Sequence, residues 1–165
     1  MSRAWVGLGS NLGSDLGNSA AHIQAALSAL DGLPDTSCLR ASRLYRSAPI
    51  GPQDQDDFCN AVAELETQIP ATALLKQLLE IEQEHQRKRT RRWGPRSLDL
   101  DLLLYGDLML NTAFLKLPHP RMHERAFVLV PMAELEPTLE IPQRGAVSHL
   151  LRALSEQQIA LWDSP

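Results

Sequence analysis

Residues 84–105 read EHQRKRTRRWGPRSLDLDLLLY, a basic run followed by a strand-like segment that carries two carboxylates. The second part is rich in apolar residues compatible with a strand, and a Gly-Asp turn signal follows it. Residues two apart in a strand project to the same face, about 6–7 Å apart along the chain. We therefore expect a strand over 99–105 with Asp99 and Asp101 on one face, while the neighbouring leucines face the core: Leu98, Leu100 and Leu102.

The basic run directly before these carboxylates indicates what the strand binds. It contains six cationic side chains: Arg87, Lys88, Arg89, Arg91, Arg92 and Arg96. Such cations hold polyphosphates, and carboxylate oxygens are the hard ligands that Mg²⁺ takes when it bridges phosphate oxygens. Either half alone is more typical of a solvated surface, but the helix-breaking Trp-Gly-Pro between them can fold the arginines over the carboxylates. Together they predict a metal-phosphate site for a phosphoryl-type transfer.

Length and composition restrict the class of protein. The chain has 165 residues, which predicts one domain over 1–165, and its formal charge of −4 argues against a general nucleic-acid or membrane binder. Cys38 and Cys59 are expected to be reduced structural thiols. Neither a secretory signal nor an apolar run long enough for a membrane span is seen, so we expect a soluble, cytoplasmic protein.

The order of predicted elements indicates the fold. Strands are expected over 4–8, 36–47, 58–69 and 99–105, and helices over 16–30 and from Pro70 to the basic run. A glycine-punctuated loop over 9–14 is more typical of a tight turn than of a phosphate cradle, and a loop over 48–57 separates two strands. This order predicts an α+β fold, a ferredoxin-like βαββαβ sandwich whose largely antiparallel sheet is backed by helices. A helix candidate at 147–154 extends it at the C-terminus.

Several blocks of sequence occur together in an order that resembles one known family. The central block is RWGPRSLDLDLL (92–103), and the others are GSNLG (9–13), YRSAPIGPQDQ (45–55), FCNA (58–61) and LPHPR through RAF (117–127). The chain resembles the 6-hydroxymethyl-7,8-dihydropterin pyrophosphokinases of folate synthesis from about Val6 to about Pro137. The resemblance implies transfer of the β,γ-pyrophosphoryl group of ATP to the hydroxymethyl group of the pterin, with release of AMP.

The resemblance also implies roles for individual residues. Asp99 and Asp101 would bind two Mg²⁺ ions, with Asp101 a candidate proton acceptor, and Arg87 and Arg89 would close over the phosphates. The nucleotide site would include Glu82, Trp93, Arg96, His119 and Arg125. The pterin ring would stack between Phe58 and Phe127, with further contacts from Ser47, Asn60, Pro49 and Ile50. The expected partners are ATP and the pterin, with no nucleic acid or membrane, and the chain is expected to be a monomer.

Two other classes of protein use some of the same residues. A metal-dependent nuclease or nucleotidyltransferase also needs paired carboxylates beside cations, but it predicts a long basic groove, whereas here the cations are confined to one loop. A non-catalytic nucleotide-binding module predicts ATP binding without AMP formation and has no use for paired metal carboxylates.

Overall fold

Six strands form one antiparallel sheet in the described part of the computed structural model, which comprises residues 1–11, 16–48, 57–87 and 98–162. The order is β10-β3-β4-β1-β5, and β2 pairs with β4 beside β3. The strands are β1 (Ser2–Ser10), β2 (Thr36–Ala41), β3 (Tyr45–Ser47), β4 (Phe58–Thr67), β5 (Asp99–Tyr105) and β10 (Ile159–Leu161).

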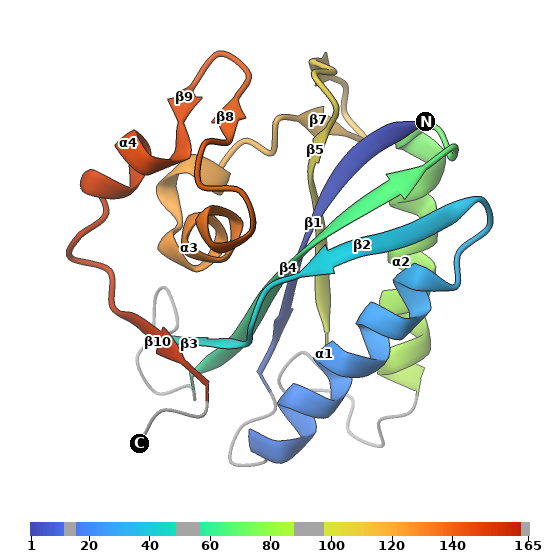
Figure 1. Cartoon of the computed structure of the whole chain (residues 1–165). Coiled ribbons are helices and arrows are strands. Elements are labelled where there is room, and N and C mark those ends of the chain that lie inside the picture. Colours follow the sequence, from blue (N-terminus) through green and yellow to red (C-terminus); the bar gives the residue numbers. More distant parts are fainter. Residues whose placement is uncertain (12–15, 49–56, 88–97, 163–165) are drawn as a thin grey trace.

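Helices cover both faces of this sheet (Figure 1). Helices α1 (Leu16–Asp31) and α2 (Ala71–Arg87) pack on one face, while α3 (Ala126–Leu135) and α4 (Val147–Arg152) lie on the other. Order and pairing are those of a βαββαβ unit with C-terminal additions, so the predicted ferredoxin-like fold is confirmed. Shorter elements complete the chain: β6 (Leu110–Asn111), β7 (Lys116–Leu117), η1 (Met122–Glu124), β8 (Glu140–Ile141) and β9 (Gly145–Ala146).

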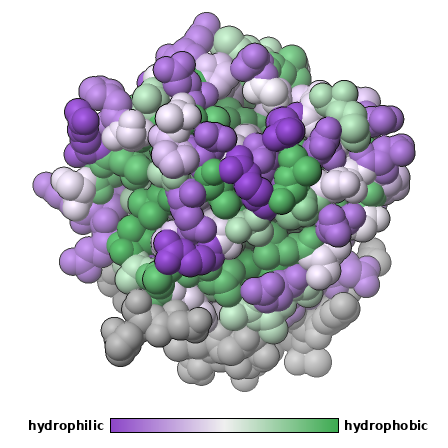
Figure 2. All heavy atoms as spheres, in the orientation of Figure 1, coloured by the Kyte–Doolittle hydropathy of each residue, from purple (hydrophilic) through white to green (hydrophobic). Residues whose placement is uncertain are grey.

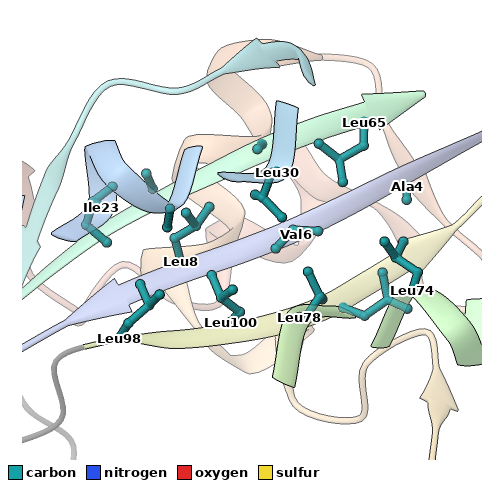
Figure 3. Close-up of a cluster of buried hydrophobic side chains, with 14 of the residues drawn as sticks. Ala4, Val6, Leu8, Ile23, Leu30, Leu65, Leu74, Leu78, Leu98 and Leu100 are labelled. Atoms are coloured by element: carbon teal, nitrogen blue, oxygen red, sulfur yellow. The ribbon is translucent and has the colours of Figure 1, made fainter. Parts of the chain in front are cut away.

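The larger core lies between the sheet and helices α1 and α2 (Figure 3). Alternate residues of β1 enter it, because successive side chains of a strand point to opposite faces. Leu98, Leu100 and Leu102 are buried in the same cluster, as their alternation with the two aspartates predicted. The helices contribute Ile23 and Leu30 from α1 and Leu74 and Leu78 from α2.

A second core joins the other sheet face to α3. Trp5 of β1 and Leu103 of β5 pack there with Leu129 and Met132 of α3. The register between β1 and β5 shifts at this point, since Trp5 pairs with Leu104 whereas the next residue pairs with Leu102. This β-bulge places both Leu103 and Leu104 in the α3 cluster.

The sheet differs from the sequence prediction in two places. The single strand expected over 36–47 is interrupted, because Ser42 replaces part of the backbone ladder: its hydroxyl accepts a hydrogen bond from the Val62 backbone N–H at 3.0 Å. The loop expected to begin at Gly9 begins later, because pairing on both sides of β1 continues through this residue. Both predictions were wrong for the same reason, since local sequence did not reveal these contacts between strands.

The surface is mixed in character. Figure 2 shows patches of hydrophobic side chains between hydrophilic ones on one face of the molecule. Exposed large apolar residues include Leu108, Met109 and Phe114 near the β6–β7 hairpin. Cys38 and Cys59 are free thiols, as predicted. Within the described residues, none of the helices has the length and apolar character needed to cross a membrane.

Two neighbouring leucines of α2 provide a test of the core. Leu78 is 0% exposed in the larger cluster, whereas Leu79 is 40% exposed. We predict that Leu78→Ala lowers the free energy of unfolding by about 2–5 kcal/mol through lost burial and a residual cavity. The matched change Leu79→Ala is expected to alter it by about 0.5 kcal/mol or less. Denaturant titration measures both, and equal losses would contradict this description of the core.

Candidate functional site

A pocket of about 230 Å³ opens on the α3 face of the sheet, where β1 ends and β4 and β5 begin. The strand register brings its walls together, because Gly9 of β1 pairs with Asn60 of β4 on one side and with Asp99 of β5 on the other. Ser47 of β3 adjoins Phe58 of β4. The lining residues are Gly7, Leu8, Gly9, Ser47, Ala48, Phe58, Asn60, Ala61, Asp99, Asp101, Arg125, Phe127 and Val128.

Two glycines of β1 form part of the lining. A Cβ atom at Gly9 would lie 3.4 Å from the Asn60 Oδ1 atom, and one at Gly7 would lie 3.5 Å from the Leu103 side chain. Side chains at these two positions would project to the pocket face of the sheet, as Trp5 does further along the strand. The absence of side chains at both positions therefore leaves room for a ligand.

A buried pair of polar side chains forms one end of the pocket. Asn60 is 3% exposed, and its Nδ2 donates to the Ser47 hydroxyl at 2.6 Å and to the Phe58 carbonyl oxygen at 3.4 Å. Because Nδ2 is engaged by the protein, Oδ1 is the amide atom that can accept a hydrogen bond from a ligand. A group of this kind can distinguish a heterocycle that carries N–H donors from one that does not.

Aromatic rings come to the pocket from two distant segments. Phe58 begins β4, and Phe127 lies in the first turn of α3. The guanidinium carbon of Arg125 lies 5.5 Å from the centroid of the Phe127 ring, a cation–π arrangement. Half-buried rings and one oriented amide make this part of the pocket suitable for a flat polar heterocycle.

The two carboxylates of β5 face the same pocket from its other side. Asp101 lies near two cationic or imidazole groups: its Oδ2 is 3.9 Å from Arg125 Nη1, and its Oδ1 is 4.0 Å from His119 Nε2. In the described residues, no cluster of three His, Cys, Asp or Glu side chains is arranged to hold a metal. Asp99 and Asp101 fit Mg²⁺ nonetheless, because this ion binds through one or two carboxylates and takes its other ligands from water and phosphate.

The His119 ring has a defined orientation. Its Nδ1 accepts a hydrogen bond from the Arg121 backbone N–H at 3.2 Å, which leaves the Nε2 edge towards Asp101. Burial lowers the pKa of His119; Asp101 opposes this shift, and the nearby Arg125, Arg144 and Arg121 reinforce it. The lowered pKa favours the neutral ring, and the hydrogen bond accepted at Nδ1 places the proton of the neutral ring on Nε2.

Other residues predicted for the site lie beside the pocket or outside the described residues. Glu82 of α2 accepts a hydrogen bond at 2.7 Å from the backbone N–H of Leu100, so it anchors α2 to β5 between the two aspartates. Arg87 is the last residue of α2. The remaining predicted residues lie outside the described part of the chain: Pro49, Ile50, Arg89, Trp93 and Arg96.

Sequence reasoning missed part of the pocket. Gly7 was treated as an ordinary strand residue and Gly9 as the start of a turn, yet both line the pocket. Their spacing of two was a usable signal, since glycines at alternate positions of a strand leave one face open. Ala48, Ala61 and Val128 also line it and gave no signal of their own.

The sequence and the fold are both similar to known proteins. The sequence matches the family described as 7,8-dihydro-6-hydroxymethylpterin-pyrophosphokinase (HPPK) over residues 5–137. Relatives named 2-amino-4-hydroxy-6-hydroxymethyldihydropteridine pyrophosphokinase include one from Haemophilus influenzae, 40% identical over 96% of this chain and 97% of that protein. Another, from Pseudomonas aeruginosa, is 47% identical over 92% of this chain and 91% of that protein.

Solved structures agree on the fold. A crystal structure of Plasmodium falciparum HPPK-DHPS with pterin and p-hydroxybenzoate superposes with a TM-score of 0.70 at 14% identity over 94% of this chain. A second HPPK-DHPS structure, in complex with substrates, gives a TM-score of 0.71 at 12% identity. This chain spans 43% of each of those proteins. With its site geometry, its extensive sequence match and this shared fold, the chain belongs to the 7,8-dihydro-6-hydroxymethylpterin-pyrophosphokinase family.

Proposed function

We propose that this chain transfers the pyrophosphoryl group of ATP to the hydroxymethyl group of 6-hydroxymethyl-7,8-dihydropterin, forming the pterin diphosphate and AMP. The observation that carries the proposal is one pocket in which Asp99 and Asp101 face a space that Phe58, Phe127 and Asn60 also line. A phosphate-handling side and a heterocycle-binding side thus meet in one cavity. The relatives are named as pyrophosphokinases of a hydroxymethyldihydropteridine, and these names support the choice of heterocycle and of transferred group.

On the pterin side, the chain supplies stacking and hydrogen bonding. In the proposal the ring lies between Phe58 and Phe127, where its flat faces contact aromatic carbon. Asn60 Oδ1 accepts a hydrogen bond from a pterin N–H. The Ser47 hydroxyl accepts one from Asn60 Nδ2 and so keeps the amide in this orientation. Because Asn60 is buried and already oriented, it loses little conformational entropy when the substrate binds.

On the phosphate side, Asp99 and Asp101 would hold two Mg²⁺ ions. Bound Mg²⁺ neutralises phosphate charge and lowers the pKa of an attacking hydroxyl group. Asp101 is also the candidate acceptor for the hydroxyl proton, and Arg125 lies near enough to it to offset its negative charge. Arg125 and His119 would contact the nucleotide beside them.

Further residues belong to the nucleotide side of the proposed site. Arg87 and Arg89 would close over the phosphates and exclude water, while Glu82, Trp93 and Arg96 would belong to the nucleotide site. We further propose that the chain acts as one domain, as a monomer in the cytoplasm, on small molecules alone.

The reaction is tested by incubating the purified chain with ATP, Mg²⁺ and 6-hydroxymethyl-7,8-dihydropterin and separating the nucleotides by chromatography. AMP that forms only when the pterin is present is the expected result. ADP would show transfer of a single phosphoryl group, and ATP binding without turnover would indicate a binding module. Each of these two results would refute the proposal.

The two carboxylates provide a direct test of the metal assignment. Asp99→Asn and Asp101→Asn remove one negative charge each with little change in shape, and we predict that each lowers kcat at least roughly 100-fold at saturating Mg²⁺. Asp107→Asn is the matched control, because this exposed aspartate follows the same strand at its far end. Normal turnover by either site variant would refute the assignment.

A separate variant tests the pterin side. We predict that Asn60→Leu raises KM for the pterin about tenfold or more and leaves KM for ATP close to its original value, because an acceptor for the heterocycle is lost. Asn111→Leu, at an exposed position of β6, controls for the change of side chain. Steady-state kinetics with each substrate varied in turn, alongside thermal unfolding, give the comparison. Equal changes in the two KM values would argue against a pterin-specific role.

A further inference from the structure

The C-terminal segment follows the part of the chain that the family matches, and its residue Arg144 lies close to the site. Arg144 lies in the turn between β8 and β9, where its backbone N–H donates to the Ile141 carbonyl oxygen at 2.9 Å. Pro142 and Gln143 occupy the two central positions of this turn, and Gln143 has a φ of 63°. Proline followed by a residue with positive φ is the arrangement of a type II turn, so the turn holds Arg144 in a defined position.

The guanidinium of Arg144 contacts the main chain at His119. Its Nη1 donates to the His119 carbonyl oxygen at 2.5 Å. On the other side of the same residue, the His119 backbone N–H donates to the Leu103 carbonyl oxygen of β5 at 2.9 Å. The His119 carbonyl oxygen also accepts a longer hydrogen bond, at 3.4 Å, from the Met122 backbone N–H. The peptide groups on both sides of His119 are therefore held, one by the central sheet and the other by the C-terminal hairpin together with this local turn.

The anchored main chain at His119 carries an imidazole with a defined orientation. The ring is held by the Arg121 backbone N–H at Nδ1, and its Nε2 lies 4.0 Å from Asp101 Oδ1. A change of main-chain direction at His119 would move Nε2 relative to Asp101, because the side chain has only two rotatable bonds. The Arg144 contact is a charge-assisted hydrogen bond, stronger than one between neutral groups, and partial burial of the guanidinium excludes some of the competing water.

We propose that Arg144 is a positioning residue for the nucleotide side of the site, and that it acts by holding the main chain of His119 so that the imidazole faces Asp101. The inference rests on the proposed function for its effect on turnover. It rests on geometry alone for its effect on the orientation of the ring. Two measurements therefore test the effect on turnover and the effect on ring orientation separately.

The kinetic measurement compares Arg144→Met with the unmodified chain. Methionine keeps an apolar stem of similar length but has no donor, and kcat/KM for ATP is expected to fall about tenfold, the effect of losing one charge-assisted hydrogen bond. KM for the pterin should stay unchanged, because Ser47, Asn60 and Phe58 line the pterin side of the pocket, whereas Arg144 contacts the main chain at His119. Arg152→Met, at an exposed position of α4, controls for loss of a C-terminal positive charge.

A double-mutant cycle tests whether the effect passes through His119. In a His119→Ala background there is no imidazole to orient, so Arg144→Met should change kcat/KM for ATP by less than about twofold. A full tenfold loss in this background would overturn the proposal, since Arg144 would then act on the nucleotide directly or on stability. Thermal unfolding of all variants shows whether any of them has lost stability. Arg144→Lys keeps a donor at this position and serves as the conservative variant, so it separates loss of folding from displacement of His119.

The second measurement does not need activity. The chain has five histidines, and ring ¹⁵N–¹H spectra resolve each imidazole, with the His119 signals identified by their absence in His119→Ala. We expect Arg144→Met to shift or broaden the His119 signals and Arg152→Met to leave them unchanged. Unshifted His119 signals in Arg144→Met would overturn the positioning role, whatever the assay shows. Absence of pterin-dependent AMP from the unmodified chain would instead overturn the proposed function.

Discussion

The register of β1 against its two neighbours is the constraint on which the site depends. Gly9 pairs with Asn60 on β4 and with Asp99 on β5, so one backbone position fixes both the heterocycle-binding amide and the first carboxylate. Side chains alternate along a strand, and a shift of one residue in either pairing would turn these groups to the opposite face. The shift is disfavoured because it would also move the apolar residues of β1 and β5 out of the core between the sheet and helices α1 and α2.

The same strand explains why a cavity forms at this end of the sheet. On the α3 face of β1, Trp5 is large and packs with Leu103 against the helix, whereas Gly7 and Gly9 have no side chains. The space between sheet and α3 is therefore filled at one end and open at the other. A closely packed interior is the normal outcome of folding, so a cavity at this point requires residues that leave it open. Gly7 and Gly9 meet this requirement, because they occupy alternate positions of β1 on the face towards α3.

Local patterns predicted the features that depend on one segment at a time. The alternation of Asp99 and Asp101 with leucines gave the strand, its core face and the shared direction of both carboxylates, because period-two alternation is a property of a single strand. The break at Ser42 was missed, since it depends on a hydrogen bond to Val62 of a different strand. Strand β10 was missed for a similar reason: it is a three-residue edge strand specified by its pairing with β3 and not by its own composition.

The carboxylates and the groups that face them are held by different parts of the chain. Asp99 and Asp101 belong to a strand of the central sheet, whereas the segment from His119 to Ala126 receives much of its support from C-terminal residues. Gln157 accepts from the Ala126 backbone N–H and donates to the Glu124 carbonyl oxygen, each at 2.8 Å, which braces the chain on both sides of Arg125. Arg144 supports His119 on one side, through the His119 carbonyl oxygen. The distances between Asp101 and its two neighbours therefore depend on how the C-terminal segment packs against the sheet, although none of the described residues of that segment lines the pocket.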